Sequence, residues 1–160
     1  MSNIRIEALK GDYKNYDVYE NVLNYIAQKT YIGGYGFSCN PDYLINEQFR
    51  MSETCSSNSS IRKMWHFIIT FSASWNLQPL LQLANTVAMG FAPEYQILYG
   101  IDTKKGNTHL HFGVNAFSYH PDHPVLSEEM MLDYLTQLQK YLQKHYSHMT
   151  VTLQFLRKGE

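Results

Sequence analysis

Residues 108–117 read Thr-His-Leu-His-Phe-Gly-Val-Asn-Ala-Phe, and polar or small residues alternate with apolar ones through most of this stretch. Successive side chains of a strand point to opposite faces of a sheet. The apolar positions beginning with Leu110 would therefore face a core, and His109 and His111 would share the other face. The pattern predicts a half-buried strand and makes a β-sheet the centre of the fold.

Further strands and helices flank this stretch in an order typical of an α+β domain. The other strands are predicted at residues 4–9, 64–72, 95–101 and 150–156, and a glycine-rich turn at residues 31–36. Helices are predicted at residues 17–29, 41–51 and 77–91, followed by a long helix that Ser127 caps. Asp17 and Glu20 are expected to form a capping box at the start of the first helix. The expected fold is one domain over residues 1–160, an antiparallel sheet of about five strands with helices packed on one face.

The composition is that of an ordinary globular chain, with 44% hydrophobic residues and a net charge of −1 at pH 7. No apolar run reaches the length of about eighteen residues that a membrane helix needs, and no secretory signal is read at the N-terminus. The two cysteines, Cys39 and Cys55, are too few for a disulfide scaffold. We therefore expect free thiols, a cytoplasmic location and no membrane partner.

The near-neutral charge limits how strongly the whole chain can attract nucleic acid. Contacts to phosphates would have to come from local basic residues. The candidates are Lys29, Arg62, Lys63, Lys104 and Lys105. The aromatic content of 14% would suit bases that stack on exposed rings, although most aromatic side chains belong to cores.

The histidines of the central strand have the spacing of a metal site. Two imidazoles about 7 Å apart on a rigid strand can converge on one divalent ion. Gly113 would leave room beside them for a ligand, and Asn115 on the same face would orient a metal-bound oxygen. Solvent-facing histidines without a metal are the alternative, and the pair alone does not name the ion. His66, in strand 64–72, is either a strand-end residue with a satisfied hydrogen bond or a polar lining of the metal site.

Three segments resemble motifs of the relaxases of plasmids and conjugative elements, which are DNA endonucleases of the HUH kind. Residues 21–26, Asn-Val-Leu-Asn-Tyr-Ile, resemble the first motif, which reads Leu-x-Tyr-Ile on a helix. Residues 65–71 are similar to the second motif, a histidine followed by Ser/Thr-Phe. Residues 99–115 resemble the third, in which an aspartate-bearing turn leads to His-x-His-x-x-x-Asn. The three segments occur in the order of the family and cover most of the chain.

The resemblance implies a ferredoxin-like antiparallel sheet with the histidines on a central strand. It implies site- and strand-specific nicking of single-stranded DNA at an origin of transfer, with Mg²⁺ or Mn²⁺ and with accessory mobilization proteins as possible partners. The phenol of Tyr25 would attack the phosphodiester. The expected catalytic residues are Tyr25, Asp102 and His66, and the expected metal ligands are His109, His111 and Asn115.

The sequence departs from the family pattern at the third metal ligand. Many relatives carry a histidine two residues before the aspartate of the third motif, where this chain has Gly100. A third ligand would then come from Asp102, Asn115, His66 or water. The turn from Asp102 to His109 is also longer than usual.

Other interpretations of these residues stay open. Tyr25 could be a packed core residue, and Tyr31 or Tyr35 could reach the metal from the glycine-rich segment. The chain could be a degenerate DNA-binding module with the relaxase fold. A histidine-triad nucleotide hydrolase is a weaker alternative, because Gly113 stands where that class needs its third histidine.

Overall fold

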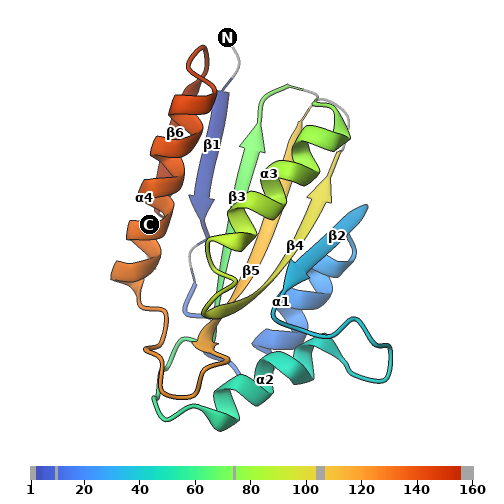
Figure 1. The fold of residues 1–160 in the computed structure, drawn as a ribbon, viewed down its shortest axis with the longest axis vertical. Coiled ribbons are helices and arrows are strands. Elements are labelled where there is room, and N and C mark those ends of the chain that lie inside the picture. The colour runs from blue at the N-terminus through green and yellow to red at the C-terminus, as the bar shows by residue number, and fades with distance from the viewer. Residues whose placement is uncertain (1–2, 10, 74, 104–106, 156–160) are drawn as a thin grey trace.

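A computed structural model describes residues 3–9, 11–73, 75–103 and 107–155. The strands are β1 (Asn3–Ala8), β2 (Tyr31–Tyr35), β3 (Met64–Phe71), β4 (Tyr95–Asp102), β5 (Thr108–Ser118) and β6 (Thr150–Phe155). The helices are α1 (Val18–Ala27), α2 (Ile45–Cys55), α3 (Leu77–Met89) and α4 (Glu128–His145). The α+β class is as predicted, and the strands form one sheet in the order β2-β4-β5-β3-β1-β6 (Figure 1).

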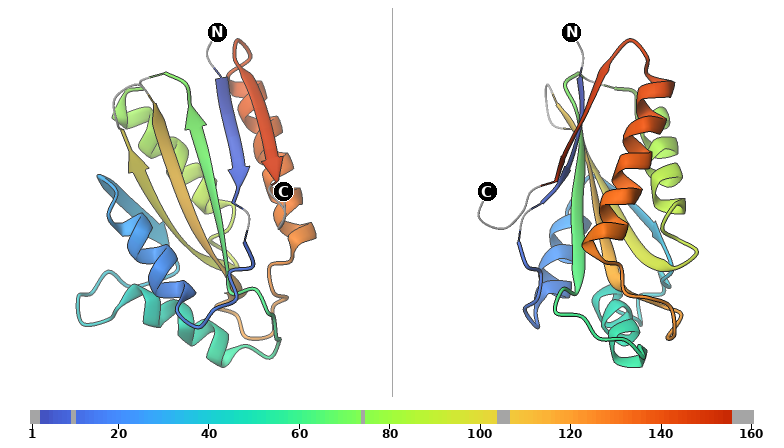
Figure 2. Two further views of the ribbon diagram at one scale, coloured as in Figure 1. Left: turned by 180° about the vertical axis from the view of Figure 1, so that it is seen from behind. Right: turned by 90° about the vertical axis from the view of Figure 1, so that its left-hand side faces the viewer.

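The sheet lies between two unequal helical layers. Helices α3 and α4 run along one face, and α1 and α2 cover the opposite face only near one end (Figure 2). The larger hydrophobic core lies on the α3–α4 side, and a smaller one lies beneath α1 and α2. The expectation of helices on a single face was therefore wrong.

The alternation in β5 has the predicted consequence. Leu110, Phe112 and Val114 are fully buried in the larger core, and the Phe112 ring stacks on Phe67 with centroids 4.6 Å apart. Hydrogen bonds to β4 and β3 fix β5 near the middle of the sheet. The histidines of β5 are thereby fixed on the face that carries α1.

Two features of the sheet differ from the prediction. Strands β1 and β6 pair in parallel, so the sheet is mixed rather than antiparallel. Residues predicted as a glycine-rich turn form the edge strand β2, which pairs with β4. A Cβ at Gly33 would lie 2.4 Å from the Tyr99 hydroxyl, and one at Gly34 would lie 2.2 Å from the Ile97 carbonyl oxygen. The glycines therefore allow close packing against β4 in an extended strand. A turn was expected in their place because glycine favours turns.

Two helices begin differently from the prediction. Helix α2 begins at Ile45 rather than near Pro41. The expected capping box of α1 does not form, because Asp17 makes no side-chain cap and Glu20 instead pairs with Arg50 of α2. This ion pair ties α1 to α2. In the described part of the chain no helix is both long and apolar enough to cross a membrane.

Ser127 caps α4 as predicted, because its hydroxyl accepts a hydrogen bond of 3.2 Å from the backbone N–H of Met130. Replacing Ser127 by alanine leaves that N–H without this partner. We expect a loss of about 1 kcal/mol in the free energy of unfolding, measured by chemical denaturation. Thr136→Ala, at a half-buried position in the middle of the same helix, is the control and should cost less. Equal stability of Ser127→Ala and the wild type would contradict the role of the cap.

Candidate active site

Helix α1 approaches the sheet closely because two glycines lie beneath it. A Cβ at Gly113 would come within 2.8 Å of Ile26 Cδ1, and one at Gly100 within 2.7 Å of the Ile26 carbonyl oxygen. Gly113 was expected to leave room for a ligand, and this was wrong. The space is filled by the buried face of α1, which includes Val22 and Ile26. Gly113 instead allows α1 to lie directly over the histidine-bearing strand.

This packing brings Tyr25 to the histidines. Tyr25 lies at the border of the buried stripe of α1 and is 46% exposed, so it is not a core residue. Its ring centroid lies 5.4 Å from that of His111 and 5.8 Å from that of His66, with both histidines in edge-on contact. A phenol contributed by a helix thus meets two imidazoles contributed by two neighbouring strands.

The third imidazole, that of His109, lies on the other side of His111. The ring centroids of His109 and His111 are 6.1 Å apart. Thr70 Oγ1 lies 3.3 Å from His109 Nδ1, within hydrogen-bonding distance, and holds the ring by that edge. No motif in the sequence singles out Thr70, because only the pairing register puts it opposite His109.

Burial keeps the inner imidazoles neutral. Desolvation, with a smaller contribution from the Lys29 charge, lowers the pKa of His66 to about 4. Desolvation, followed by the effects of His66 and Lys29, lowers the pKa of His111 to about 3. At neutral pH both rings are therefore uncharged, which is the form that binds metal ions and accepts protons.

These pKa shifts predict a loss of stability in mild acid. Below pH 6.5 the unfolded chain protonates His66 and His111, whereas the folded chain does not until about pH 4 and about pH 3. The free energy of unfolding is therefore unaffected by these two histidines well above pH 6.5. It falls as the pH drops from about 6.5 toward the folded pKa values of about 4 and about 3. For both together we expect a loss on the order of 2–4 kcal/mol between pH 7 and pH 5, measured by urea denaturation. The double variant His66→Gln/His111→Gln should show a flatter pH dependence, and an unchanged slope would contradict the prediction.

A cation completes the group around the phenol. Lys29 follows the last turn of α1, and its Nζ lies 4.1 Å from the centroid of the Tyr25 ring. The same Nζ lies 3.9 Å from Asp102 Oδ2, and both side chains are largely buried. Asp102 is paired with His109 across β4 and β5, so its carboxylate belongs to the same face. Lys29, a candidate DNA-binding residue, thus lies beside Tyr25. Asp102, a candidate catalytic residue, lies beside His109.

Gly100 has a structural reason to replace a histidine. It pairs with His111, so a side chain here would point toward the same site. That position is taken by α1, since a Cβ would lie 2.8 Å from Lys29 Cγ as well as 2.7 Å from the Ile26 carbonyl oxygen. The end of α1 therefore fills the place of the third ligand of the family pattern.

Other candidate residues lie away from this group. Asn115 is fully buried, and its amide donates to the Phe49 carbonyl and the Gln96 side chain at 2.9 Å each. Arg62 Cζ lies 3.8 Å from the centroid of the Trp65 ring, and Lys63 forms an ion pair with Glu53. Lys104 and Lys105 are outside the described residues.

The rival tyrosines lie on the opposite face of the sheet. Tyr31 is paired with Ile101, which is buried in the core on the α3–α4 side. Tyr35 donates a hydrogen bond of 3.3 Å to Asn85 of α3. Of these three tyrosines, only Tyr25 contacts the histidines.

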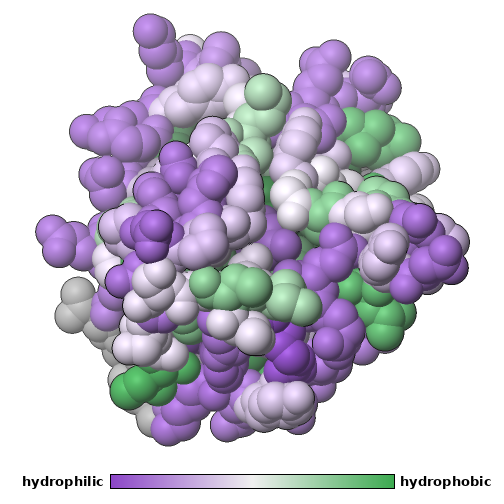
Figure 3. Space-filling model, turned by 60° about the horizontal axis from the view of Figure 1, so that its bottom comes forward, coloured by the Kyte–Doolittle hydropathy of each residue, from purple (hydrophilic) through white to green (hydrophobic). Residues whose placement is uncertain are grey.

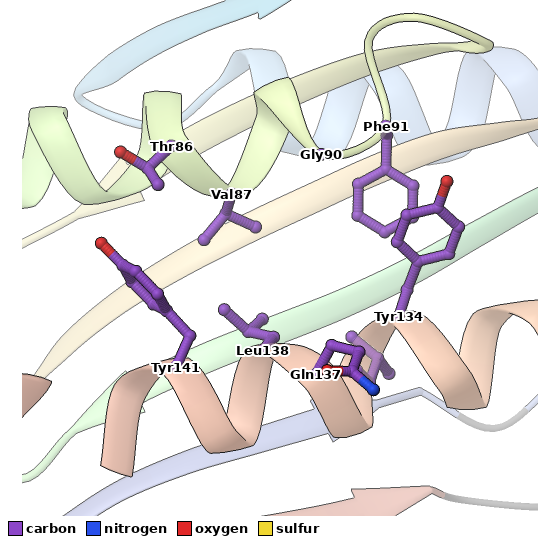
Figure 4. A pocket seen from close by; sticks show the side chains of 9 residues that line it. Thr86, Val87, Gly90, Phe91, Tyr134, Gln137, Leu138 and Tyr141 are labelled. Atoms are coloured by element: carbon purple, nitrogen blue, oxygen red, sulfur yellow. The ribbon is translucent and has the colours of Figure 1, made fainter. Parts of the chain in front are cut away.

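Two hollows elsewhere on the molecule do not involve the histidines. One, of about 240 Å³, lies between α3 and α4, where Phe91, Tyr134 and Leu138 line it (Figure 4). The sheet separates it from His111. The other lies beside α2, at the end that Figure 3 brings forward, where hydrophobic residues form separate patches among hydrophilic ones. The candidate active site is instead an assembly on the sheet surface at the edge of α1.

Comparison with protein families connects this geometry to a class of enzyme. The family model described as "Relaxase: MobA/VirD2-like, nuclease domain" matches residues 22–147. The chain belongs to this relaxase family. The matched span begins just before Tyr25 and includes His66, His109 and His111. Comparison with curated proteins and with solved structures returned no match.

The relaxase family is generally metal-dependent, and the imidazoles beside Tyr25 are the candidate ligands. Among the described residues, no group of three or more histidine, cysteine, aspartate or glutamate side chains is arranged to hold a metal ion. The donor set nevertheless fits an ion in its chemistry, because His66 and His111 are adjacent, buried and neutral. The relaxase domain thus carries two adjacent, buried imidazoles beside Tyr25.

Proposed function

We propose that this relaxase domain nicks single-stranded DNA at an origin of transfer by tyrosine transesterification, for the mobilization of a plasmid or conjugative element. The observation that supports it most is the contact of the Tyr25 ring with His66 and His111 on the face that also holds Lys29. Accessory mobilization proteins are candidate partners. We place the reaction in the cytoplasm.

The proposed reaction forms one bond and breaks another at the same phosphorus atom. The Tyr25 oxygen attacks the scissile phosphorus in line, and the bond from phosphorus to the 3′ oxygen breaks. The phenol proton passes to an acceptor on this face, for which we propose the Asp102 carboxylate. Asp102 then returns the proton, directly or through water, to the leaving oxygen, which ends as a 3′ hydroxyl. The product is a 5′-phosphotyrosyl link, which keeps the energy of the phosphodiester and permits the strand to be rejoined.

His109 and His111 are the proposed metal ligands on β5. A bound divalent ion would neutralise charge on the non-bridging phosphate oxygens and orient the scissile phosphate. Thr70 holds His109 by Nδ1, which leaves Nε2 as the nitrogen for the ion. We do not include Asn115, because its amide is engaged by protein groups beneath α2.

Lys29 is the proposed phosphate contact nearest the nucleophile. Replacing it by glutamine removes a positive charge beside Tyr25 and Asp102. We expect Lys29→Gln to weaken binding of single-stranded DNA several-fold and to reduce the dependence of binding on salt concentration, measured by fluorescence anisotropy. Lys14→Gln, on an exposed loop, is the control. Unchanged affinity and salt dependence in Lys29→Gln would exclude the phosphate contact.

The decisive experiment is the search for a covalent adduct. The protein is incubated with a divalent ion and single-stranded oligonucleotides of randomised sequence, and adducts are separated under denaturing conditions. Peptide mass spectrometry should place the attached nucleotide on Tyr25. An adduct on another residue, or cleavage of nucleoside phosphoramidates, would overturn the proposal.

A second candidate function is that of a noncatalytic DNA-binding module. The filling of the third-ligand position by α1 favours it. Binding of single-stranded DNA without any adduct, in the presence of Mg²⁺, Mn²⁺ or Zn²⁺, would support the module and overturn the nuclease.

A further inference from the structure

We propose that His66 of β3 takes over the ligand position that Gly100 of β4 has lost, and that the ion is of an imidazole-preferring, tetrahedral kind such as Zn²⁺ or Co²⁺. The inference rests on the proposed function, whose metal site it deepens. Strands β4 and β3 flank β5 on opposite sides, so the third ligand would come from β3 instead of β4. It also replaces the expectation of Mg²⁺ or Mn²⁺.

The distance between two nitrogens is the first argument. His66 Nε2 lies 3.4 Å from His111 Nδ1. This separation is long for a hydrogen bond between nitrogens, whose usual length is about 2.9–3.0 Å. Two nitrogens bound at about 2.1 Å to one tetrahedral ion would be separated by about 3.4 Å. The pair is therefore already spaced as one edge of such a site.

The surroundings of the pair are the second argument. His66 is 6% exposed and His111 is 4% exposed, so both rings are shielded from water by the protein. Hard ions such as Mg²⁺ prefer oxygen ligands and retain water, whereas neutral imidazoles suit Zn²⁺ and related ions. The edge-on contact of Tyr25 with both rings places the phenol next to the proposed ion.

His109 is positioned to complete the set. It is half-buried, and Thr70 holds its Nδ1 edge. We expect the ion to draw the His109 ring toward the pair, with a phosphate oxygen of the DNA as the remaining ligand. The Lys29 ammonium nearby opposes a cation, so affinity should rise when DNA is bound.

The first test uses the unaltered protein and the metal alone. Zn²⁺ is titrated into protein labelled with ¹⁵N, and the imidazole nitrogens are followed by long-range proton–nitrogen correlation spectra. We expect the resonances of His66 Nε2 and His111 Nδ1 to shift together with added Zn²⁺. A shift of His109 and His111 without His66, or no binding of Zn²⁺ or Co²⁺ at all, would overturn the proposal.

The second test compares variants by the visible absorption of bound Co²⁺. His66→Gln should lower Co²⁺ affinity at least tenfold and change the band intensity, because one nitrogen is lost from the ion. His145→Gln, an exposed histidine on α4, makes the same chemical change away from the site and should leave both unchanged. Circular dichroism confirms that each variant is folded. Bands in His66→Gln identical to those of the wild type would overturn the proposal.

Failure of this inference can be distinguished from failure of the proposed function. A Tyr25 adduct formed with Mg²⁺, without a shift of His66 on Zn²⁺ titration, would leave the nuclease standing and remove His66 as a ligand. Zn²⁺ bound through His66, without any adduct, would keep the metal site and remove the nuclease.

Discussion

Tyr25→Phe is expected to abolish the covalent adduct and to lower nicking by at least about 1,000-fold, because it removes the only oxygen of the proposed nucleophile. Binding of single-stranded DNA should be nearly unchanged, since the ring and its contacts with His66 and His111 remain. The side chain is 46% exposed, so stability should stay within about 0.5 kcal/mol of the wild type. The adduct is measured on denaturing gels and affinity by anisotropy.

Tyr31→Phe is the matched control. It makes the same change at a tyrosine of similar exposure, 39%, on the opposite face of the sheet. It should nick as the wild type does. Adduct formation by Tyr25→Phe together with its loss in Tyr31→Phe would show that the nucleophile lies on the edge strand β2 and would refute the assignment of Tyr25.

Gly100→His, which restores the histidine of the family pattern, is expected to damage the protein instead of improving its metal site. Even the Cβ would lie 2.7 Å from the Ile26 carbonyl oxygen, which is backbone and cannot turn aside. We expect Gly100→Ala to cost about 1–3 kcal/mol of unfolding free energy, and the larger histidine to cost more. Because relief requires α1 to move off the sheet, Tyr25 should also lose its contact with His111, and nicking should fall. Thermal unfolding and the adduct assay measure the two effects.

Gly90→Ala provides the control for this prediction. Gly90 follows α3 with an ordinary negative φ, and a Cβ there would lie 3.2 Å from the Val87 carbonyl oxygen. Its replacement should be far better tolerated. Tighter metal binding by Gly100→His with unchanged stability would show that α1 yields easily, contrary to the packing argument.

The parts of the fold that could be predicted are those with a strong local signal. The alternation around Leu110 predicted β5 and its core face, and Ser127 predicted the start of α4. Strand β2 could not be predicted, because Gly33 and Gly34 have turn propensity. They occur in a strand because a larger side chain would clash with the Tyr99 side chain or the Ile97 carbonyl of β4. The parallel pairing of β1 with β6 likewise has no local signature.

The site was predictable in its residue types but not in its geometry. Tyr25, His66 and His111 were identified from motifs, and the structure brings them together. The roles of Gly100 and Gly113 depend on where α1 lies on the sheet, which no motif encodes. The hydrogen-bond partner of His109 and the position of Lys29 over a phenol ring also follow from tertiary packing alone.

The pairing of β1 with β6 bears on how the domain is made. Asn3 lies opposite Thr150, so β1 is synthesised long before the strand that covers its outer edge in the sheet. Until then β1 can pair only with β3, and its other edge stays available to foreign strands. Contacts so distant in sequence slow folding, so the nascent chain should depend on chaperone protection until synthesis reaches β6.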